Sequence, residues 1–340
     1  MEAAFIFPAV KGFQANHEYF ISMVPLEIIP RIFQFSDDEL PPEIRAQRIL
    51  NKARVPEIRD YILENPDSYV FSSLTVSVDG DMAFSSISDQ EPMIGHIKIS
   101  MNAQFLINDG QHRRAAISEA IKKKPALKNE HISVVFYHDQ GLRHSQQMFS
   151  DLNRYAIRPT RSINILFNSR EESSIIAKEV SERVYVFRGL IEKEKTAISN
   201  RSKALFTLSA ICTSTEQLLD DLEMDAQEKI EFAVEFWESA ARHMEEWVAV
   251  KEGRMKSSDV RKEYICSLGI TLTAIGYAGN ALFKKNRNGW KPALTGLDEI
   301  NWKKDNPIWE GLIFANGRVA ANRANQQAMS HYIANLLMNN

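Results

Sequence analysis

The chain has 340 residues, enough to bury a sizeable core in one large or two ordinary domains. Hydrophobic residues make up 44% and charged residues 25%, the composition of a globular protein, which excludes a disordered or fibrous class. With 41 basic against 44 acidic residues, the net charge of −3 excludes bulk electrostatic attraction as the main mode of nucleic-acid binding. Any such binding must use a local basic patch.

The N-terminal part begins with strand patterns and continues with helical ones. Apolar runs at 5–7 and 19–24 predict strands, and a turn with proline at position 25 leads into a short helix that reaches residue 33. Residues 42–63 have a helical pattern, and Pro56 within them marks the start of a second helix.

Further strands are expected before and after a helix at 114–121. The sequence at 78–82, with Asp-Gly at its centre, predicts a hairpin turn between two of these strands. The strand patterns lie at 69–78, 93–99, 105–107 and 131–137.

From residue 142 onward the pattern is almost entirely helical. It is clearest at 203–219 and 226–250, and it returns at 322–338. Residues 265–283 carry no charge over 19 positions, but three glycines and four polar residues predict a buried core helix and not a membrane span.

These patterns predict an α+β protein with a mixed domain at 1–168 and a mostly α-helical domain at 169–340. Cys212 and Cys266 lie in apolar helical surroundings, which predicts buried free thiols and excludes a disulfide framework. Because the N-terminus lacks a secretory signal pattern, we expect a cytoplasmic protein without a membrane partner.

The segment FLINDGQHRRAAISEAI at 105–121 combines a buried strand, a turn and a helix. Asp109 and Gly110 are turn residues, and polar and cationic side chains follow at the start of the helix. Helix N-termini present unpaired N–H groups and partial positive charge, so this segment predicts a phosphate site. Its members are Asp109, Gly110, Gln111, His112, Arg113 and Arg114.

Two alternatives stay open for the same residues. In the structural one, Asp109 caps the helix, Gly110 permits the turn, and the charged side chains form a solvated first turn. In the catalytic one, His112 acts as a general base toward a phosphate-bound water, and Asp109 holds a metal through its carboxylate.

A second group comprises Gln47, Arg48, Asn51 and Arg54. On a helix Gln47, Asn51 and Arg54 share a face, and arginine and amide side chains suit phosphate oxygens or base edges of DNA. A solvated helix face is the alternative.

The densest basic patch lies within SDLNRYAIRPTRS at 150–162, which contains three arginines within eight residues. With Tyr155 between them, Asn153, Arg154, Arg158 and Arg161 suit a sugar-phosphate backbone. A capping role for Asn153 is equally compatible with the pattern.

The pentapeptide DGQHR is the signature of the DGQHR-domain family, which includes the DndB proteins of DNA sulfur modification. Three other parts of the first half resemble the same proteins. They are FIFPAVKG with EYFISMVPLEIIPRIFQF at the N-terminus, AQRILNKARVPEIRDYI at 46–62, and MFSDLNRYAIRPTRSINILF at 148–167.

This resemblance implies a ParB/sulfiredoxin-like fold for the N-terminal domain, with Arg48 and Arg54 beside Arg113. It also implies a DNA-binding accessory or transcriptional regulatory protein of the DNA phosphorothioate modification system. Double-stranded DNA and other Dnd modification proteins would be its partners, and homo-oligomerisation is left open.

The resemblance also carries an alternative, a DNA-stimulated nucleotide hydrolase or DNA nickase that uses the same turn. Some related folds bind nucleotides there, so a nucleoside triphosphate with Mg²⁺ would be its cofactor. Apart from that, we expect no resident metal.

Overall fold

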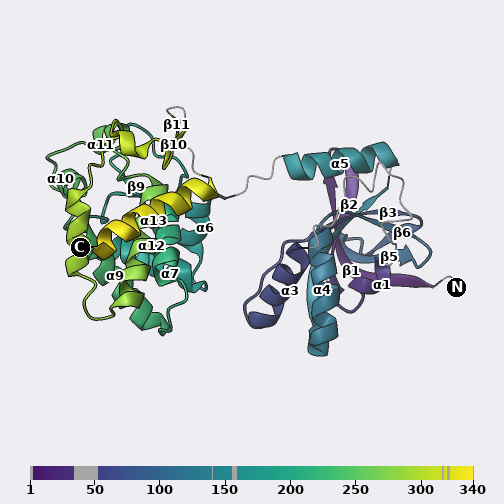
Figure 1. Cartoon of the computed structure of the whole chain (residues 1–340). Helices are drawn as coiled ribbons and strands as arrows, with labels where there is room; N and C mark the ends of the chain where they lie inside the picture. The colour runs from purple at the N-terminus through teal and green to yellow at the C-terminus, as the bar shows by residue number, and fades with distance from the viewer. Residues whose placement is uncertain are drawn as a thin grey trace. The chain divides into compact units, whose positions relative to one another are not determined.

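The computed structural model describes residues 3–33, 53–139, 141–154, 159–315, 318–319 and 322–339. The chain divides into two compact units, Met1–Ile157 and Arg158–Asn340, called unit 1 and unit 2 below (Figure 1). Unit 1 is built around a β-sheet, whereas unit 2 is mainly helical. The predicted α+β class with a helical C-terminal region is therefore confirmed.

In the described part of unit 1, seven strands form one sheet in the order β4-β5-β1-β2-β7-β3-β6. β7 lies between β2 and β3; it is antiparallel to β2 and parallel to β3. The strands are β1 (Ala4–Gln14), β2 (His17–Pro25), β3 (Leu74–Asp79), β4 (Met82–Ser88), β5 (Glu91–Ser100), β6 (Gln104–Asp109) and β7 (His131–His138).

The two faces of the sheet differ because side chains alternate along each strand. Phe7, Phe20 and Phe136 lie on the inner face and are buried in the core. Ile6 and Val10 lie on the outer face and are exposed. The strands predicted from the apolar runs at 5–7 and 19–24 are β1 and β2.

Two helices cover the inner face, α3 (Arg54–Glu64) and α4 (Gln111–Lys123), which pack against each other (Figure 1). Ile62 of α3 and Ile117 of α4 enter the same core as the strands. The short α1 (Ile29–Ile32) also packs on α4.

A fourth helix, α5 (Leu142–Arg154), contacts β6 from the outer face. Its position follows from Ser77 of β3, which alternates with the inner-face residues Val76 and Val78 and lies near Ser145 of α5.

The turn at 78–82 is not a hairpin, so that prediction is wrong. Gly80 has a φ of 140°, as the Asp-Gly pattern suggests, but β3 pairs with β6 and β7. β4 pairs with β5 at the far edge of the sheet. Turn residues fix the local backbone, but they do not decide which strands pair.

Unit 2 is organised around α12 (Gly269–Lys285), which packs on α8 (Leu208–Leu219) and α13 (Arg323–Asn339). α12 is buried along most of its length, as predicted for 265–283. In the described residues no helix is long and apolar enough to cross a membrane. The other α-helices are α6 (Arg161–Phe167), α7 (Glu172–Arg183), α9 (Ala226–Ala241), α10 (Glu245–Lys251) and α11 (Ser257–Glu263).

The stretch at 226–250 forms two helices instead of the single one expected. α9 ends at Ala241 and α10 begins at Glu245, yet Met244 in the break is fully buried. The apolar periodicity continues through the interruption because this side chain still faces the core. Periodicity alone therefore could not reveal the break.

Gly276 of α12 allows the close approach of α8. A Cβ at this position would lie 2.1 Å from the carbonyl oxygen of Ser214. We expect Gly276→Ala to lower the free energy of unfolding by about 2 kcal/mol or more, because one helix must shift. Tryptophan fluorescence during chemical denaturation measures this directly, since all five tryptophans lie in unit 2.

Gly269→Ala is the matched control in the same helix. Its added Cβ would lie 3.6 Å from the Cβ of Ala210, an ordinary contact. Equal losses in the two variants would contradict close packing at Gly276.

Candidate phosphate site at the signature turn

The DGQHR segment joins β6 to α4. β6 ends at Asp109, Gly110 is the N-cap with a φ of 100°, and α4 begins at Gln111. A Cβ at Gly110 would lie 2.3 Å from Cδ2 of Leu74, so both the backbone conformation and the neighbouring β3 require glycine. The first turn of α4 holds no acidic residue and has no side-chain cap.

Arg113 holds the turn together through contacts within the protein. Its Nη2 lies 2.5 Å from Oδ2 of Asp109. Its Nη1 donates to the carbonyl oxygens of Ser72 at 2.7 Å and Ser73 at 3.1 Å, and to the hydroxyl of Ser72. The side chain is only 15% exposed. Arg113 therefore fastens the segment before β3 to the start of α4, and Asp109 offsets its charge.

Arg114 is also used within unit 1. Its Nη2 donates to the carbonyl oxygen of Phe33 at 2.9 Å, which ties α4 to the residue after α1. Two of the cations that the sequence suggested for a phosphate thus bond to neighbouring backbone.

Arg54 lies close enough to His112 for its charge to act on the imidazole. Burial is the larger cause that lowers the pKa of His112, Arg54 lowers it further, and Asp109 opposes both. An ion pair between Arg59 of α3 and Glu119 of α4, at 3.1 Å, supports this placement. Arg54 itself is exposed, and among the described residues it makes no ion pair.

At the N-terminus of α4, an anion would meet one cation, Arg54, and one titratable ring, the imidazole of His112. The N–H of Arg114 is bonded to the carbonyl of Gly110 at 2.9 Å, and the N–H groups before it form the positive end of α4. Chemically, this group can hold a phosphate oxygen and share a proton with it.

Several predicted residues cannot be placed. Gln47, Arg48, Asn51 and Arg158 lie outside the described residues. Asn153 is in the last turn of α5, with a side chain outside the described set.

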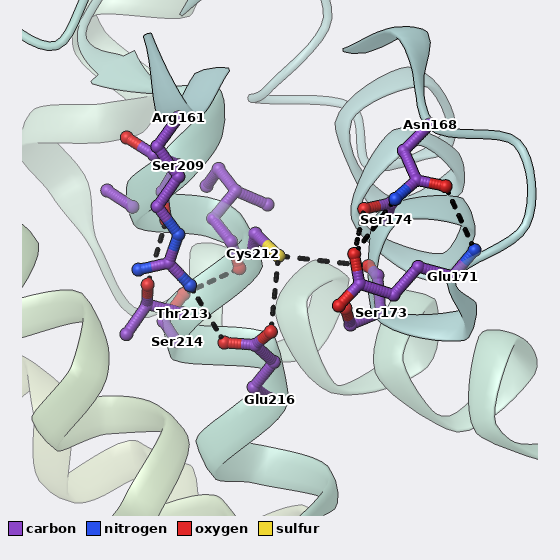
Figure 2. A network of polar contacts seen from close by, with 12 residues as sticks. Arg161, Asn168, Glu171, Ser173, Ser174, Ser209, Cys212, Thr213, Ser214 and Glu216 are labelled. Atoms are coloured by element: carbon purple, nitrogen blue, oxygen red, sulfur yellow. Dashed lines mark hydrogen bonds and ion pairs between the residues drawn. The ribbon is translucent and has the colours of Figure 1, made fainter. Parts of the chain in front are cut away.

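Arg154 and Arg161, from the dense basic patch, belong to different units. Arg154 is exposed at the end of α5 in unit 1. Arg161 begins α6 in unit 2, where its Nη2 lies 3.2 Å from Oε2 of Glu216 (Figure 2).

Figure 2 shows that Glu216 also faces Cys212. The sulfur of Cys212 lies 3.6 Å from Oε1 of Glu216 and 3.9 Å from the carbonyl oxygen of Ser173. Burial, with the charge of Glu216, raises the pKa of this thiol to about 12. Cys212 and Cys266 are both buried free thiols, as predicted.

Comparison with known proteins shows that residues 7–339 match the family DndB, described as DNA-sulfur modification-associated. The chain belongs to the DndB family. The match includes both units, whereas the resemblance visible in the sequence motifs was confined to the first half. No curated protein and no solved structure matches the chain.

A buried polar cluster beside the signature turn of this DndB-family protein was missed by sequence reasoning. Nδ2 of Asn108 donates to Oγ of Ser77 at 2.7 Å and contacts the sulfur of Met148 at 3.1 Å. Ser145 of α5 donates to Asp139 at 2.8 Å. The only signal in the sequence is a serine and an asparagine within apolar strands.

We expect Arg113→Ala to lower the free energy of unfolding of unit 1 by about 2 kcal/mol or more, because it leaves backbone carbonyls unbonded. Hydrogen exchange at β3 and α4 measures the loss. Tryptophan fluorescence, which reports on unit 2, serves as the internal reference.

Arg54→Ala is the control that removes an exposed arginine from the same region, with an expected change within about 0.5 kcal/mol. If Arg113→Ala were as stable as Arg54→Ala, the structural assignment of Arg113 would be wrong.

Proposed function

We propose that this DndB-family protein is a DNA-binding accessory or transcriptional regulatory protein of the phosphorothioate modification system. In this proposal the N-terminus of α4 contacts a phosphate of double-stranded DNA, and other Dnd modification proteins are its partners. Family membership supports the link to DNA sulfur modification. The DNA contact is supported by the packing of α3 on α4, with the ion pair of Arg59 and Glu119, and by the effect of the Arg54 charge on the pKa of His112 at the start of α4.

The energetics favour a positioning contact over sequence recognition. A helix N-terminus contributes about 0.3–1 kcal/mol to the binding of an anion. Contacts to phosphate fix the register of a protein on DNA but carry no base sequence. The protein therefore needs further backbone contacts on each unit by itself, for which we propose Arg154 and Arg161 with the unplaced Gln47, Arg48, Asn51, Asn153 and Arg158.

The two thiols support an accessory role over direct handling of sulfur. The nucleophile in sulfur chemistry is the thiolate. Burial raises the pKa of both Cys212 and Cys266, so both are protonated at neutral pH.

Arg54→Ala should weaken binding to a fluorescent mixed-sequence DNA duplex several-fold. The slope of log affinity against log salt should become shallower by about one, because one phosphate contact is lost. Fluorescence anisotropy over a salt series measures both quantities.

Lys98→Ala is the matched control. Lys98 pairs with Ile6 across β1 and β5, so it lies on the outer face, opposite α3 and α4. Unchanged affinity and slope in Arg54→Ala would rule out the proposed contact, as would an equal effect in Lys98→Ala.

His112 should make DNA binding depend on pH. Its lowered pKa keeps the imidazole mostly neutral near pH 7, and a bound phosphate favours the protonated form. Affinity should therefore rise as the pH falls from about 7.5 to about 6, and His112→Gln should remove that rise. Without DNA the sign is opposite: the unfolded chain binds this proton more readily, so acid lowers stability.

The comparison of His112→Gln with the natural protein also tests the enzymatic alternative. Each nucleoside triphosphate is incubated with Mg²⁺ and DNA. Hydrolysis that disappears in the variant would replace the binding role with a nucleotide hydrolase. A pH-independent affinity in the natural protein would contradict a role for His112 in phosphate binding.

A further inference from the structure

The segment after α7 presents an exposed aromatic ring on a rigid base. Tyr185 is 45% exposed, although Val184 and Phe187 on either side are fully buried. The ring of Phe187 lies 5.2 Å from that of Phe206 and 5.9 Å from that of Trp247. These contacts fix the backbone that carries Tyr185, so its position does not depend on a mobile loop.

Two cations from distant parts of unit 2 meet at this ring. The ammonium of Lys251, at the end of α10, lies 5.0 Å from the ring centre, and the guanidinium of Arg188 lies 5.9 Å from it. Lys251 also donates to the carbonyl oxygen of Arg188 at 2.5 Å. Burial and the charge of Arg188 lower the pKa of Lys251, so the fold holds two like charges together at a cost.

Neighbouring basic residues form ion pairs with carboxylates. Arg183 lies 2.6 Å from a carboxylate oxygen of Glu231, Lys193 lies 3.4 Å from Glu182, and Arg254 lies 2.8 Å from Glu252. Within the described ranges neither Arg188 nor Lys251 has such a partner.

The nearby carboxylate of Glu238 does not act as an ion-pair partner for these two cations in the described part of the chain. Glu238 accepts a hydrogen bond from the backbone N–H of Tyr185 at 2.8 Å, and no ion pair joins it to Arg188 or Lys251 in the described part of the chain.

Space for a ligand lies beside Arg188. It lines a hollow of about 290 Å³ together with Ser181, Gly189 and the ion pair of Glu182 and Lys193, whereas Tyr185 and Lys251 lie outside the lining. A Cβ added to Gly189, which has a φ of 77°, would meet nothing within 4 Å. This volume is at the lower end for ligand pockets and suits a single phosphate or sugar.

We propose that Tyr185, Arg188 and Lys251 form a second anion site, on unit 2, which binds a phosphate group of a nucleic-acid backbone or a free nucleotide. Arg188 supplies a planar fork for phosphate oxygens, Lys251 supplies a point charge, and Tyr185 holds both cations and adds a hydroxyl donor. Cations interleaved with an exposed aromatic ring are typical of nucleic-acid contacts. The site is independent of Arg54 and His112 and goes beyond the function proposed above.

The test uses the full chain with Arg188→Ala and Lys251→Ala combined. Three probes are used. Binding of a fluorescent DNA duplex and of the corresponding single strand is measured by fluorescence anisotropy, and binding of a nucleoside monophosphate is measured by calorimetry. For a nucleic-acid ligand, DNA affinity should fall about tenfold and the salt slope should become shallower by about one, because one phosphate contact is lost. For a nucleotide ligand, only monophosphate binding should be lost. Both results support the site and identify the source of the phosphate.

Arg287→Ala combined with Lys291→Ala is the matched control. It also removes one arginine and one lysine that lie over aromatic rings, at 5.4 Å from Phe283 and 5.6 Å from Trp290. Lys291, however, is paired with Glu235. We expect this control to bind all three probes as the natural protein does.

Two further variants separate this site from the turn in unit 1. Tyr185→Leu should reproduce part of the loss. Arg188→Ala with Lys251→Ala should have the same fold-effect with or without Arg54→Ala, as expected for two independent sites. Unchanged binding of every probe in the double variant overturns the proposal. An equal loss in the matched control, or no binding of any probe by the natural protein, does so as well.

Discussion

The position of the candidate site depends on one buried guanidinium. Arg113 joins the end of β6, the segment before β3 and the first turn of α4 through Asp109, Ser72 and Ser73. Its bonds to backbone carbonyls set where α4 begins, and α3 is placed by packing on α4. Arg113 therefore helps to place His112 and, through the packing of α3 on α4, the start of α3 with Arg54, while Asp109 offsets the charge of Arg113 itself.

The different roles of Arg113 on one side and Arg54 and His112 on the other explain how far the turn at 109–113 could be predicted. The strand, the glycine turn and the helix follow from local chemistry, and the structure has all three. The roles of the arginines do not, because Arg113 and Arg114 reach residues 40 or more positions away in the chain. Local sequence shows which residues are charged, but it cannot show which charged side chains form hydrogen bonds or ion pairs within the fold.

The same limit applies to the fold as a whole. Alternating and helical periodicities gave the α+β class, the buried α12 and the buried thiols, because burial of a face leaves a periodic record. Strand pairing leaves none, so the turn at Gly80 was mistaken for a hairpin. The polar contact of Asn108 with Ser77 was missed for a related reason, since both residues look like surface positions until α5 covers them.

The central position of β7 has a consequence for how unit 1 forms. β7 is the last strand of the sheet in chain order, yet it joins β4-β5-β1-β2 on one side to β3-β6 on the other. Until residues 131–138 leave the ribosome, β2 and β3 each have an open hydrogen-bonding edge. The nascent chain therefore carries two half-sheets prone to pairing with other chains, and the sheet closes only through contacts distant in sequence, which are slow to form.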